Sequence, residues 1–438
     1  MHNHKYHDHD HNPELTTWQR DSRKPLPEQK HVERQLWLYV AAAAQEDPGS
    51  VERYGLCRTS AKHIAQSDHR KLALLCNSAI CSFRLTVNLE ELSNAVMSIE
   101  RRYEVAPLSV IQAEMKSSAD PAVEVAINYL SAIKRSAETD GHDLAQIKFG
   151  MSGLGVSIIS RASLVALRLV AATVSWGISL RYPSDLVVDI LTNENSIHCK
   201  LSAIQQMIAD TDVLPLQPEH VQREKKKHFE RFMRGISSSA NDAPDESSEI
   251  CNKGKKLMFY DPLYKKAAQL MRVGFVLEVL KIEIGRNIGD KVFARIGREQ
   301  KAAGVVMNRP TSIIPSGRFM VGYPLLIQSS ILMLIYTKLA GEKSKLSVDI
   351  NCLIGALTLV ELIKHDANIE NWPAVSPTQA YGLAREMRGG SETGEEAYID
   401  SCVSCDIPYF TSNHQGGSSS NPCPFCIVNE KNNKIGIA

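Results

Sequence analysis

Four cysteines near the carboxyl end of the chain have the spacing of a tetrahedral metal site. Cys402 and Cys405 form one C-x-x-C pair, seventeen residues follow, and Cys423 and Cys426 form a second pair. A two-residue gap lets both sulfurs of a pair turn toward one point at about 2.3 Å, so four thiolates can enclose one Zn²⁺. The alternative is two disulfides or four unrelated thiols. Because cysteine fills all four positions and leaves none for a catalytic water, we expect one structural zinc ion.

The remaining cysteines indicate no disulfide framework, because they are scattered through the chain: Cys57, Cys76, Cys81, Cys199, Cys251 and Cys352. The first residues, MHNHKYHDHDHNPE, lack the apolar core of a signal peptide, and the most apolar runs are short or are interrupted by Arg161 and Arg168. We therefore expect a cytoplasmic protein with no membrane partner. The net charge is only +1, so any nucleic-acid surface must be local.

The elements that must position the cysteines are helical. Apolar residues recur with helical spacing and β-branched alternation is scarce, which predicts an all-α fold. With 438 residues the chain can form about three domains. We expect residues 1–30 to be a disordered His-rich arm without a specific ligand, although its histidines could capture a metal adventitiously. Residues 221–256 combine a basic segment with a Ser-, Asn-, Asp- and Pro-rich stretch typical of a linker.

Between the arm and the linker the chain repeats itself. The identical positions have a fixed offset of 97, and they pair Leu72, Ser78, Ser82, Arg84 and Leu89 with Leu169, Ser175, Ser179, Arg181 and Leu186. Each copy has a long helix, an aromatic-Gly break at Gly55 or Gly150, an apolar helix, a junction that carries an arginine, and an amphipathic helix. This order predicts two modules, at residues 31–118 and 119–220.

Residues 257–430 form the third expected domain. Asp261-Pro262 can start a helix that runs to Gly285, and after a short break a second helix follows at residues 290–301, which is the outline of a helix-turn-helix. Between residues 281 and 318 there are eight Lys or Arg against three Asp or Glu. The candidate DNA contacts are Arg286, Lys291, Arg295, Arg298, Lys301, Arg309 and Arg318. An ordinary solvated helix face is the alternative.

No residue pattern supports an enzyme. The glycines from Gly150 to Gly155 follow no strand and precede no Walker lysine, so a turn with tight helix packing explains them better than a phosphate loop. The chain has no H-E-x-x-H motif and no nucleophile elbow. We therefore expect a protein without catalytic residues.

The carboxyl-terminal part, residues 258–430, resembles FlhC, the zinc-containing subunit of the bacterial flagellar master transcriptional regulator. The resemblance includes the helix at 288–301, the IPSGRFM segment that ends at Met320, the long apolar helix after Tyr323, and the C-x-x-C pairs. The two modules resemble FlhD, the helical partner subunit, whose apolar helix ends in a Cys-x-Phe-Arg junction. Residues 81–84 match that junction, and residues 178–181, Ile-Ser-Leu-Arg, are a diverged copy.

The resemblance implies a fused FlhD-FlhD-FlhC chain with a four-cysteine zinc knuckle at residues 402–426. It implies a transcriptional activator that binds double-stranded promoter DNA of flagellar or related genes and contacts RNA polymerase. It also implies a homodimer. In the family two D-type chains accompany each C-type chain, so one fused chain is half of the symmetric assembly and two chains restore the whole. The chain departs from the family at Asp406-Ile407, where glycines usually stand, at Arg309-Pro310, where a Pro-rich stretch is reduced, and at Ile178, which replaces a cysteine. The alternative function is a zinc-stabilised scaffold or adaptor that has lost DNA binding.

Overall fold

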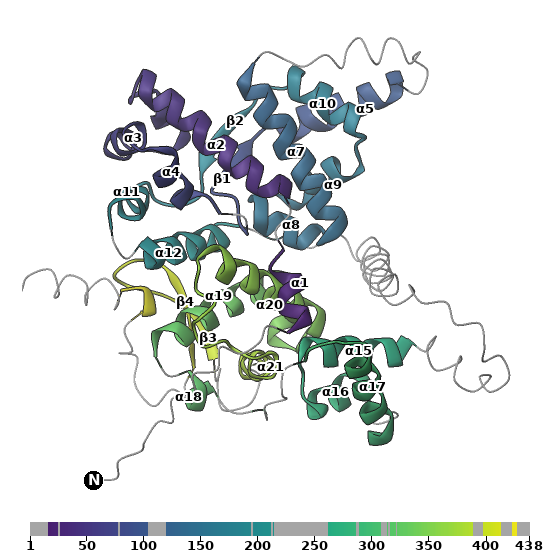
Figure 1. The fold of residues 1–438 in the computed structure, drawn as a ribbon. Coiled ribbons are helices and arrows are strands. Elements are labelled where there is room, and N and C mark those ends of the chain that lie inside the picture. Colours follow the sequence, from purple (N-terminus) through teal and green to yellow (C-terminus); the bar gives the residue numbers. More distant parts are fainter. Residues whose placement is uncertain are drawn as a thin grey trace, which may run out of the picture.

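The computed structural model describes residues 16–24, 27–77, 79–103, 120–193, 196–211, 213, 262–285, 289–307, 313, 316–320, 322–388, 397–412 and 423–426. Helices make up most of this part of the chain, which confirms the expected all-α class (Figure 1). Two small antiparallel sheets of two strands each, β1-β2 and β3-β4, were not foreseen. The expected linker at 221–256 lies outside the described residues.

The expected disordered arm is wrong from residue 16 onward. Thr16 caps the helix α1 (Thr17–Ser22), because its hydroxyl accepts from the amide of Gln19 while the Gln19 side chain accepts from the Thr16 amide. Trp18 and Arg23 are buried, and α1 packs on a helix more than three hundred residues away, described below. Residues 1–15, with their histidines, lie outside the described part of the chain.

The two repeats fold into two halves in which the six described elements of the first follow the same order as the first six of the second. The first half consists of α2 (Pro27–Glu46), η1 (Ser50–Tyr54), α3 (Arg58–Ala65), α4 (His69–Leu75), β1 (Phe83–Thr86) and α5 (Leu89–Tyr103). The second half consists of α7 (Pro121–Thr139), α8 (His142–Phe149), α9 (Gly153–Arg161), α10 (Leu164–Thr173), β2 (Gly177–Leu180), α11 (Asp185–Thr192) and α12 (Ser196–Ala209). Gly55 and Gly150 end η1 and α8 with φ of 81° and 61°, a left-handed conformation that favours glycine.

The strands β1 and β2 join the halves about a local two-fold axis. Phe83 lies directly opposite Leu180, and these residues are also counterparts at the repeat offset of 97. The pairing of Arg84 with Ser179 is mirrored by the hydrogen bond from the Arg181 amide to the Ser82 carbonyl, 3.0 Å. The offset of 97 relates Ser82 to Ser179 and Arg84 to Arg181, so a two-fold axis that exchanges the halves also exchanges these two pairs. The internal repeat seen in the sequence is therefore also a repeat in space.

The two halves interleave rather than standing apart as separate modules. The last helix of the first half, α5, packs on α9 and α10 of the second half. In the same way α11 packs on α3 and α4, and the long helices α2 and α7 pack on each other. The boundary between residues 118 and 119 therefore divides the repeats in sequence only. We call this unit the paired halves.

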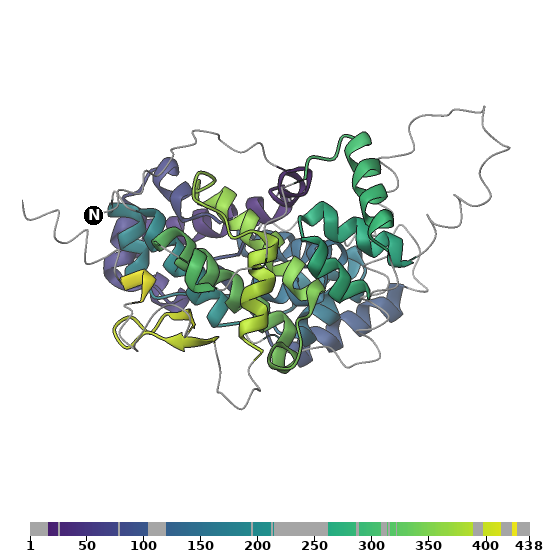
Figure 2. The same cartoon turned by 90° about the horizontal axis from the view of Figure 1, so that it is seen from below.

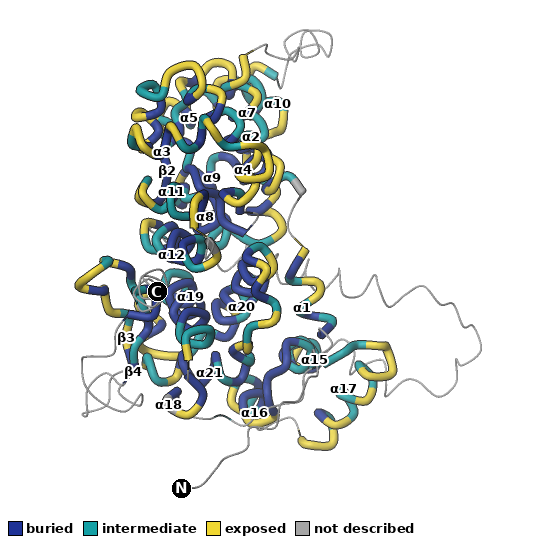
Figure 3. Tube along the Cα trace, turned by 60° about the vertical axis from the view of Figure 1, so that its left-hand side comes forward, coloured by how far each residue is buried: buried dark blue, intermediate teal, exposed yellow. Residues whose placement is uncertain are grey.

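The carboxyl-terminal part surrounds one buried helix, α19 (Tyr323–Ala340), which packs on α20 (Ile350–Asp366). The other elements are α15 (Pro262–Val273), α16 (Leu277–Ile284), α17 (Asp290–Ala302), α18 (Ser316–Phe319), η2 (Gly341–Lys345), α21 (Pro377–Glu386), β3 (Ala397–Ser401) and β4 (Pro408–Ser412). Figure 3 shows α19 and α20 as largely buried tubes. In the described part of the chain, Tyr323–Lys345 alone is long and apolar enough to cross a membrane, and 61% of its apolar window is buried inside the protein.

One expected helix is divided in two. We expected a single helix from residue 262 to Gly285, but Gly274 has a φ of 112°, which no helix accommodates, and α15 ends at Val273. The helices α15, α16 and α17 then form a compact group in which α15 packs on both of the others. We call this group the three-helix unit.

The paired halves rest on the carboxyl-terminal part through α8 and α12, which both contact α19. The Lys338 ammonium donates to the carbonyl of Ala209 at 2.9 Å, and the amide of Ala79 donates to the Asp366 carboxylate at 2.6 Å. Lys200 of α12 donates to the carbonyl of Cys76 in the first half at 3.0 Å. Contacts of this kind join segments that are far apart in the sequence.

Candidate functional site

The four cysteines of the predicted knuckle converge on one point. The Sγ atoms of Cys402 and Cys426 are 3.6 Å apart, those of Cys405 and Cys423 are 3.8 Å apart, and all four lie within 4.8 Å of one another. A tetrahedron with metal-sulfur bonds of about 2.3 Å has sulfur-sulfur edges of about 3.8 Å. A disulfide needs a separation of about 2.05 Å, so these distances exclude two disulfides in this arrangement. The cluster can therefore hold one metal ion with four sulfur ligands.

A tight turn positions the first cysteine pair at the end of a hairpin. The strands β3 and β4 pair from Ala397 opposite Ser412 to Ser401 opposite Pro408. The carbonyl of Cys402 accepts from the amide of Asp406 at 2.8 Å, and its amide donates to the carbonyl of Ile407 at 3.1 Å. Asp406 has a φ of 57°, in the left-handed region, which Asp tolerates better than most residues. Asp406 thus adopts a backbone conformation that glycine favours.

The environment of the sulfurs differs between the two pairs. Burial raises the pKa of Cys402, but the backbone amides of Cys405 and Ser404 and the neighbouring thiols outweigh it and lower the pKa to about 7. Burial raises the pKa of Cys423 to about 12, and burial together with the neighbouring thiols also raises the pKa of Cys426. Crowding several thiolates is thus unfavourable without a cation between them, and a bound divalent metal removes this penalty.

The hairpin that carries the cluster is docked on two parts of the protein at once. The Phe410 side chain is buried, and its amide donates to the Ser330 hydroxyl of α19 at 3.1 Å. Gln205 of α12 donates to the carbonyl of Pro408 at 2.7 Å, which ties the hairpin to the paired halves. Figure 2 shows the yellow hairpin at the periphery of the molecule. The cluster therefore lies at the end of a hairpin that contacts both α19 and the paired halves.

The predicted basic helix is the outermost helix of the three-helix unit. In α17, Phe293 and Ile296 are buried against the unit, as the apolar spacing predicts. Lys291, Arg298 and Lys301 are exposed and have no ion pair among the described residues. Figure 1 places α17 at the edge of the molecule, away from the paired halves. Three of the predicted contacts thus form a basic face that a partner can reach.

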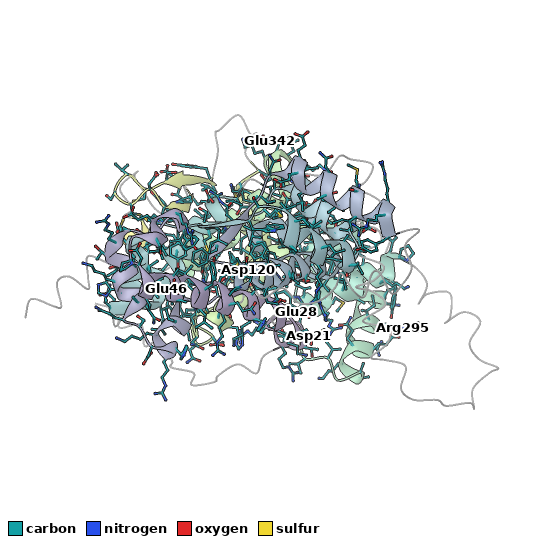
Figure 4. The ribbon with its side chains drawn as sticks, turned by 90° about the horizontal axis from the view of Figure 1, so that it is seen from above. Asp21, Glu28, Glu46, Asp120, Arg295 and Glu342 are labelled. Carbon is teal, nitrogen blue, oxygen red and sulfur yellow. The ribbon has the colours of Figure 1, made fainter. Side chains whose placement is uncertain are left out.

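The fourth predicted cation of α17 is not free. The Arg295 guanidinium donates to the Glu299 carboxylate at 2.8 Å, and the Tyr264 hydroxyl of α15 hydrogen-bonds to the same carboxylate. The hydrogen bond from Arg295 raises its pKa. Figure 4 shows Arg295 at the margin of the ribbon. A ligand of Arg295 must compete with Glu299 for the guanidinium.

The remaining predicted contacts are not brought to α17. Arg318 is exposed on α18, which packs on α21 rather than on the three-helix unit. Arg286 and Arg309 lie outside the described residues. The Lys/Arg excess between residues 281 and 318 is therefore not one continuous patch in the described part of the chain.

Sequence reasoning noted Arg181 only as part of a repeated junction and missed its role. Its guanidinium is buried and donates to the carbonyls of Cys81, Ile147, Lys148 and Met207 and to the Thr211 hydroxyl, at 2.8 to 3.2 Å. Its repeat counterpart, Arg84, is partly exposed and pairs with Asp210 at 2.9 Å. Arg181 thus joins both halves at the local axis. The repeat at the offset of 97 marked Arg181 as a residue of interest, but the repeat does not show that its side chain is buried.

Comparisons with protein-family models, with curated proteins and with solved structures found no match to this chain.

Proposed function

We propose that this protein is a DNA-binding transcriptional activator, a fused FlhD-FlhD-FlhC regulator that binds promoters of flagellar or related genes and recruits RNA polymerase. Two chains form a homodimer that replaces the family's separate D-type and C-type subunits. The metal in the cysteine cluster is one Zn²⁺, since four thiolates in a closed tetrahedral set are typical of structural zinc. The supporting observations are two halves paired about a local axis and, after them, a helical part that carries the cysteine cluster.

The observation that carries DNA binding is the exposed basic face of α17, formed by Lys291, Arg298 and Lys301. This helix is the third in a group of three, and its apolar side is buried while its cations face solvent. A helix in this arrangement can lie along a groove with its cations near phosphates. Each cation that neutralises a phosphate adds about 0.9 to the slope of log K against log salt. Three cations therefore predict a slope of about −3 for each chain.

A scaffold or adaptor is the second candidate, and Arg295 favours it. The ion pair with Glu299 removes one of four cations from the basic face, and Asp290 adds a negative charge at the start of the same helix. A face with this composition is also consistent with a solvated surface helix.

Binding of labelled upstream DNA from the same genome at several salt concentrations tests the proposal. Arg298→Ala and Lys301→Ala should each weaken binding and reduce the salt slope by about 1. Lys62→Ala, which removes an exposed lysine of α3 in the paired halves, is the matched control and should change neither quantity.

A further comparison uses the ion pair itself. Arg295→Ala should weaken binding less than Arg298→Ala, because its guanidinium is already engaged by Glu299. Glu299→Gln should release Arg295 and strengthen binding. Binding that has no salt dependence and is the same in all these variants would exclude α17 from the interface and favour the scaffold.

A further inference from the structure

Helix α1 lies between two parts of the carboxyl-terminal region, although it belongs to the amino-terminal end of the chain. It packs on α20 on one side and on α15 of the three-helix unit on the other. Its one tryptophan, Trp18, is buried in this position. A six-residue helix is too short to be stable alone, so these tertiary contacts must hold it in place.

The first contact joins α1 to the segment that follows the basic helix. The amide of Thr17 donates to the carbonyl of Val306 at 3.0 Å, and the amide of Val306 donates to the Thr17 hydroxyl at 2.9 Å. Val306 lies four residues beyond the end of α17. This reciprocal pair fixes the backbone at the end of α17 to the start of α1.

The second contact is an ion pair to the first helix of the three-helix unit. Arg272 of α15 donates to the Asp21 carboxylate at 2.8 Å. The Arg272 side chain is only 20% exposed, whereas Asp21 is 51% exposed, so solvent screens this pair in part. The ion pair therefore contributes more to the orientation of α1 on α15 than to the stability of the fold.

The third contact anchors α1 in the core. Arg23 donates through Nε and a terminal nitrogen to Oε2 of Glu361 in α20, at 3.0 and 2.8 Å, and Lys364 donates to Oε1 of the same carboxylate at 3.3 Å. All three side chains are less than a tenth exposed. Both carboxylate oxygens are satisfied, so the end of α1 is held by a buried, fully paired carboxylate.

The three-helix unit is also attached on the side of α21. Phe275 stacks edge-on against Tyr381 with ring centres 6.5 Å apart, and the Val276 amide donates to the Thr378 hydroxyl at 3.2 Å. The Tyr381 hydroxyl also donates to the Glu283 carboxylate at 3.3 Å. These contacts involve the turn between α15 and α16 and the end of α16, and none involves α17. The contacts to α21 lie along one edge of the unit, and those of α1 hold it at other points, on α15 and beyond the end of α17.

We propose that α1 is a strap that fixes the three-helix unit on α20, and that Thr17 and Arg23 are positioning residues for the basic face of α17. Helix α1 is then part of the nucleic-acid binding region, because it holds the three-helix unit in place. The DNA readout of this proposal rests on the proposed function, while the strap itself does not. The length of chain between α1 and the three-helix unit, with the paired halves inserted, explains why no local pattern revealed it.

Hydrogen-deuterium exchange of the full-length protein tests the strap without DNA. Arg23→Met removes the charge and puts an unbranched apolar side chain in its place. Lys364 still pairs with Glu361 in this variant, so the fold can persist. Thr17→Val keeps the shape of the side chain and removes one hydrogen-bond acceptor. Arg20→Ala is the matched control, because Arg20 is exposed on the same helix and has no side-chain partner among the described residues.

The expected result is faster exchange confined to residues 262–285 and 289–307. Thr17→Val should accelerate exchange there roughly fivefold, as expected for one lost hydrogen bond, and Arg23→Met roughly tenfold or more. Peptides from α7 and α19 should be unchanged, and Arg20→Ala should match the parent throughout. If both strap variants leave exchange in the three-helix unit unchanged, the strap is refuted.

DNA affinity of the same variants separates the two proposals. If exchange rises and affinity for upstream DNA falls in Arg23→Met, the strap positions the DNA-binding face. If exchange rises but neither the strap variants nor Arg298→Ala alter DNA binding, the strap is supported and the proposed function fails. If Arg298→Ala weakens binding while the strap variants raise exchange without altering affinity, the positioning role is refuted.

Discussion

Removing the metal should release the β3-β4 hairpin from the rest of the protein. The change is made either with a chelator or with Cys423→Ser, which leaves three thiol ligands. The hairpin has a small interface of its own, centred on Phe410, whose side chain is 2% exposed. Four hydrogen bonds accompany it: the Phe410 amide donates to Ser330, Gln205 donates to the Pro408 carbonyl, and the Ser412 hydroxyl bonds to the Ser316 hydroxyl and to the Glu386 carboxylate. These interactions persist only while the hairpin keeps its shape.

The size of the effect follows from these contacts. Burial of a phenylalanine contributes about 2 to 3 kcal/mol, and each hydrogen bond contributes about 1 kcal/mol. Loss of docking therefore lowers the free energy of unfolding of the carboxyl-terminal part by about 6 to 7 kcal/mol. For a cooperative unit of this size, 1 kcal/mol shifts the melting temperature by about 2 to 4 °C. We expect a decrease of roughly 12 to 28 °C.

The assay combines metal analysis with thermal unfolding of untagged protein. The parent should contain about one zinc ion per chain and Cys423→Ser much less. Cys57→Ser is the matched control, because Cys57 is a half-buried thiol of the first half, outside the cluster. Gln205→Ala should reproduce only the loss of one hydrogen bond. If metal-free protein melts at the same temperature as the metal-bound form, the structural role of the metal is wrong.

Three further predictions concern the paired halves and the assembly. Gly150→Ala should destabilise the protein by more than Gly55→Ala, as measured by urea unfolding. Both glycines have positive φ, so an alanine is strained at either position. A Cβ at position 150 would also lie 2.5 Å from Nε of the buried Arg181, whereas the atom nearest to a Cβ at position 55 is 3.6 Å away. Equal losses would mean that Arg181 can move aside at no cost. Burial raises the pKa of Glu33 above its ordinary value of 4.5, so the folded state binds this proton more tightly than the unfolded state. The contribution of Glu33 to stability must therefore fall as pH rises above about 4.5, and Glu33→Gln should flatten the pH dependence of urea unfolding above that pH. A slope that is the same in parent and variant would place the pH dependence elsewhere. Light scattering after size exclusion should give a homodimer that needs no separate D-type subunit; a monomer at micromolar concentration, both free and on DNA, contradicts the dimer.

Several features could be predicted from the sequence because they depend on neighbours along the chain. The two C-x-x-C pairs predicted a cysteine cluster, and the four sulfurs do converge. Ser376-Pro377 has the residue types that start a helix, and Ser376 caps α21 with Gln379. Spacing and capping are short-range properties, so a few adjacent residues suffice to determine them.

The apolar pattern indicated which helices exist but not where they go. The repeat at an offset of 97 predicted two similar halves, yet it could not show that α5 and α11 cross to the opposite half. An amphipathic helix has an apolar face that fits either partner, and only the packed structure selects one. The pairing of β1 with β2 has the same origin, since each strand is four residues long and has no partner within the described residues of its own half.

Charged residues showed the largest difference between sequence and structure. Arg84 and Arg181 occupy equivalent repeat positions, but one pairs with Asp210 at the surface and the other is buried among backbone carbonyls. The sequence specified four cations on α17 and their helical spacing. Only the tertiary structure decided that Arg295 is held by Glu299 and that α1, through Arg23, reaches Glu361. A charge acts over a few ångströms in space, and the partners that neutralise or orient it are brought there by the fold of distant segments.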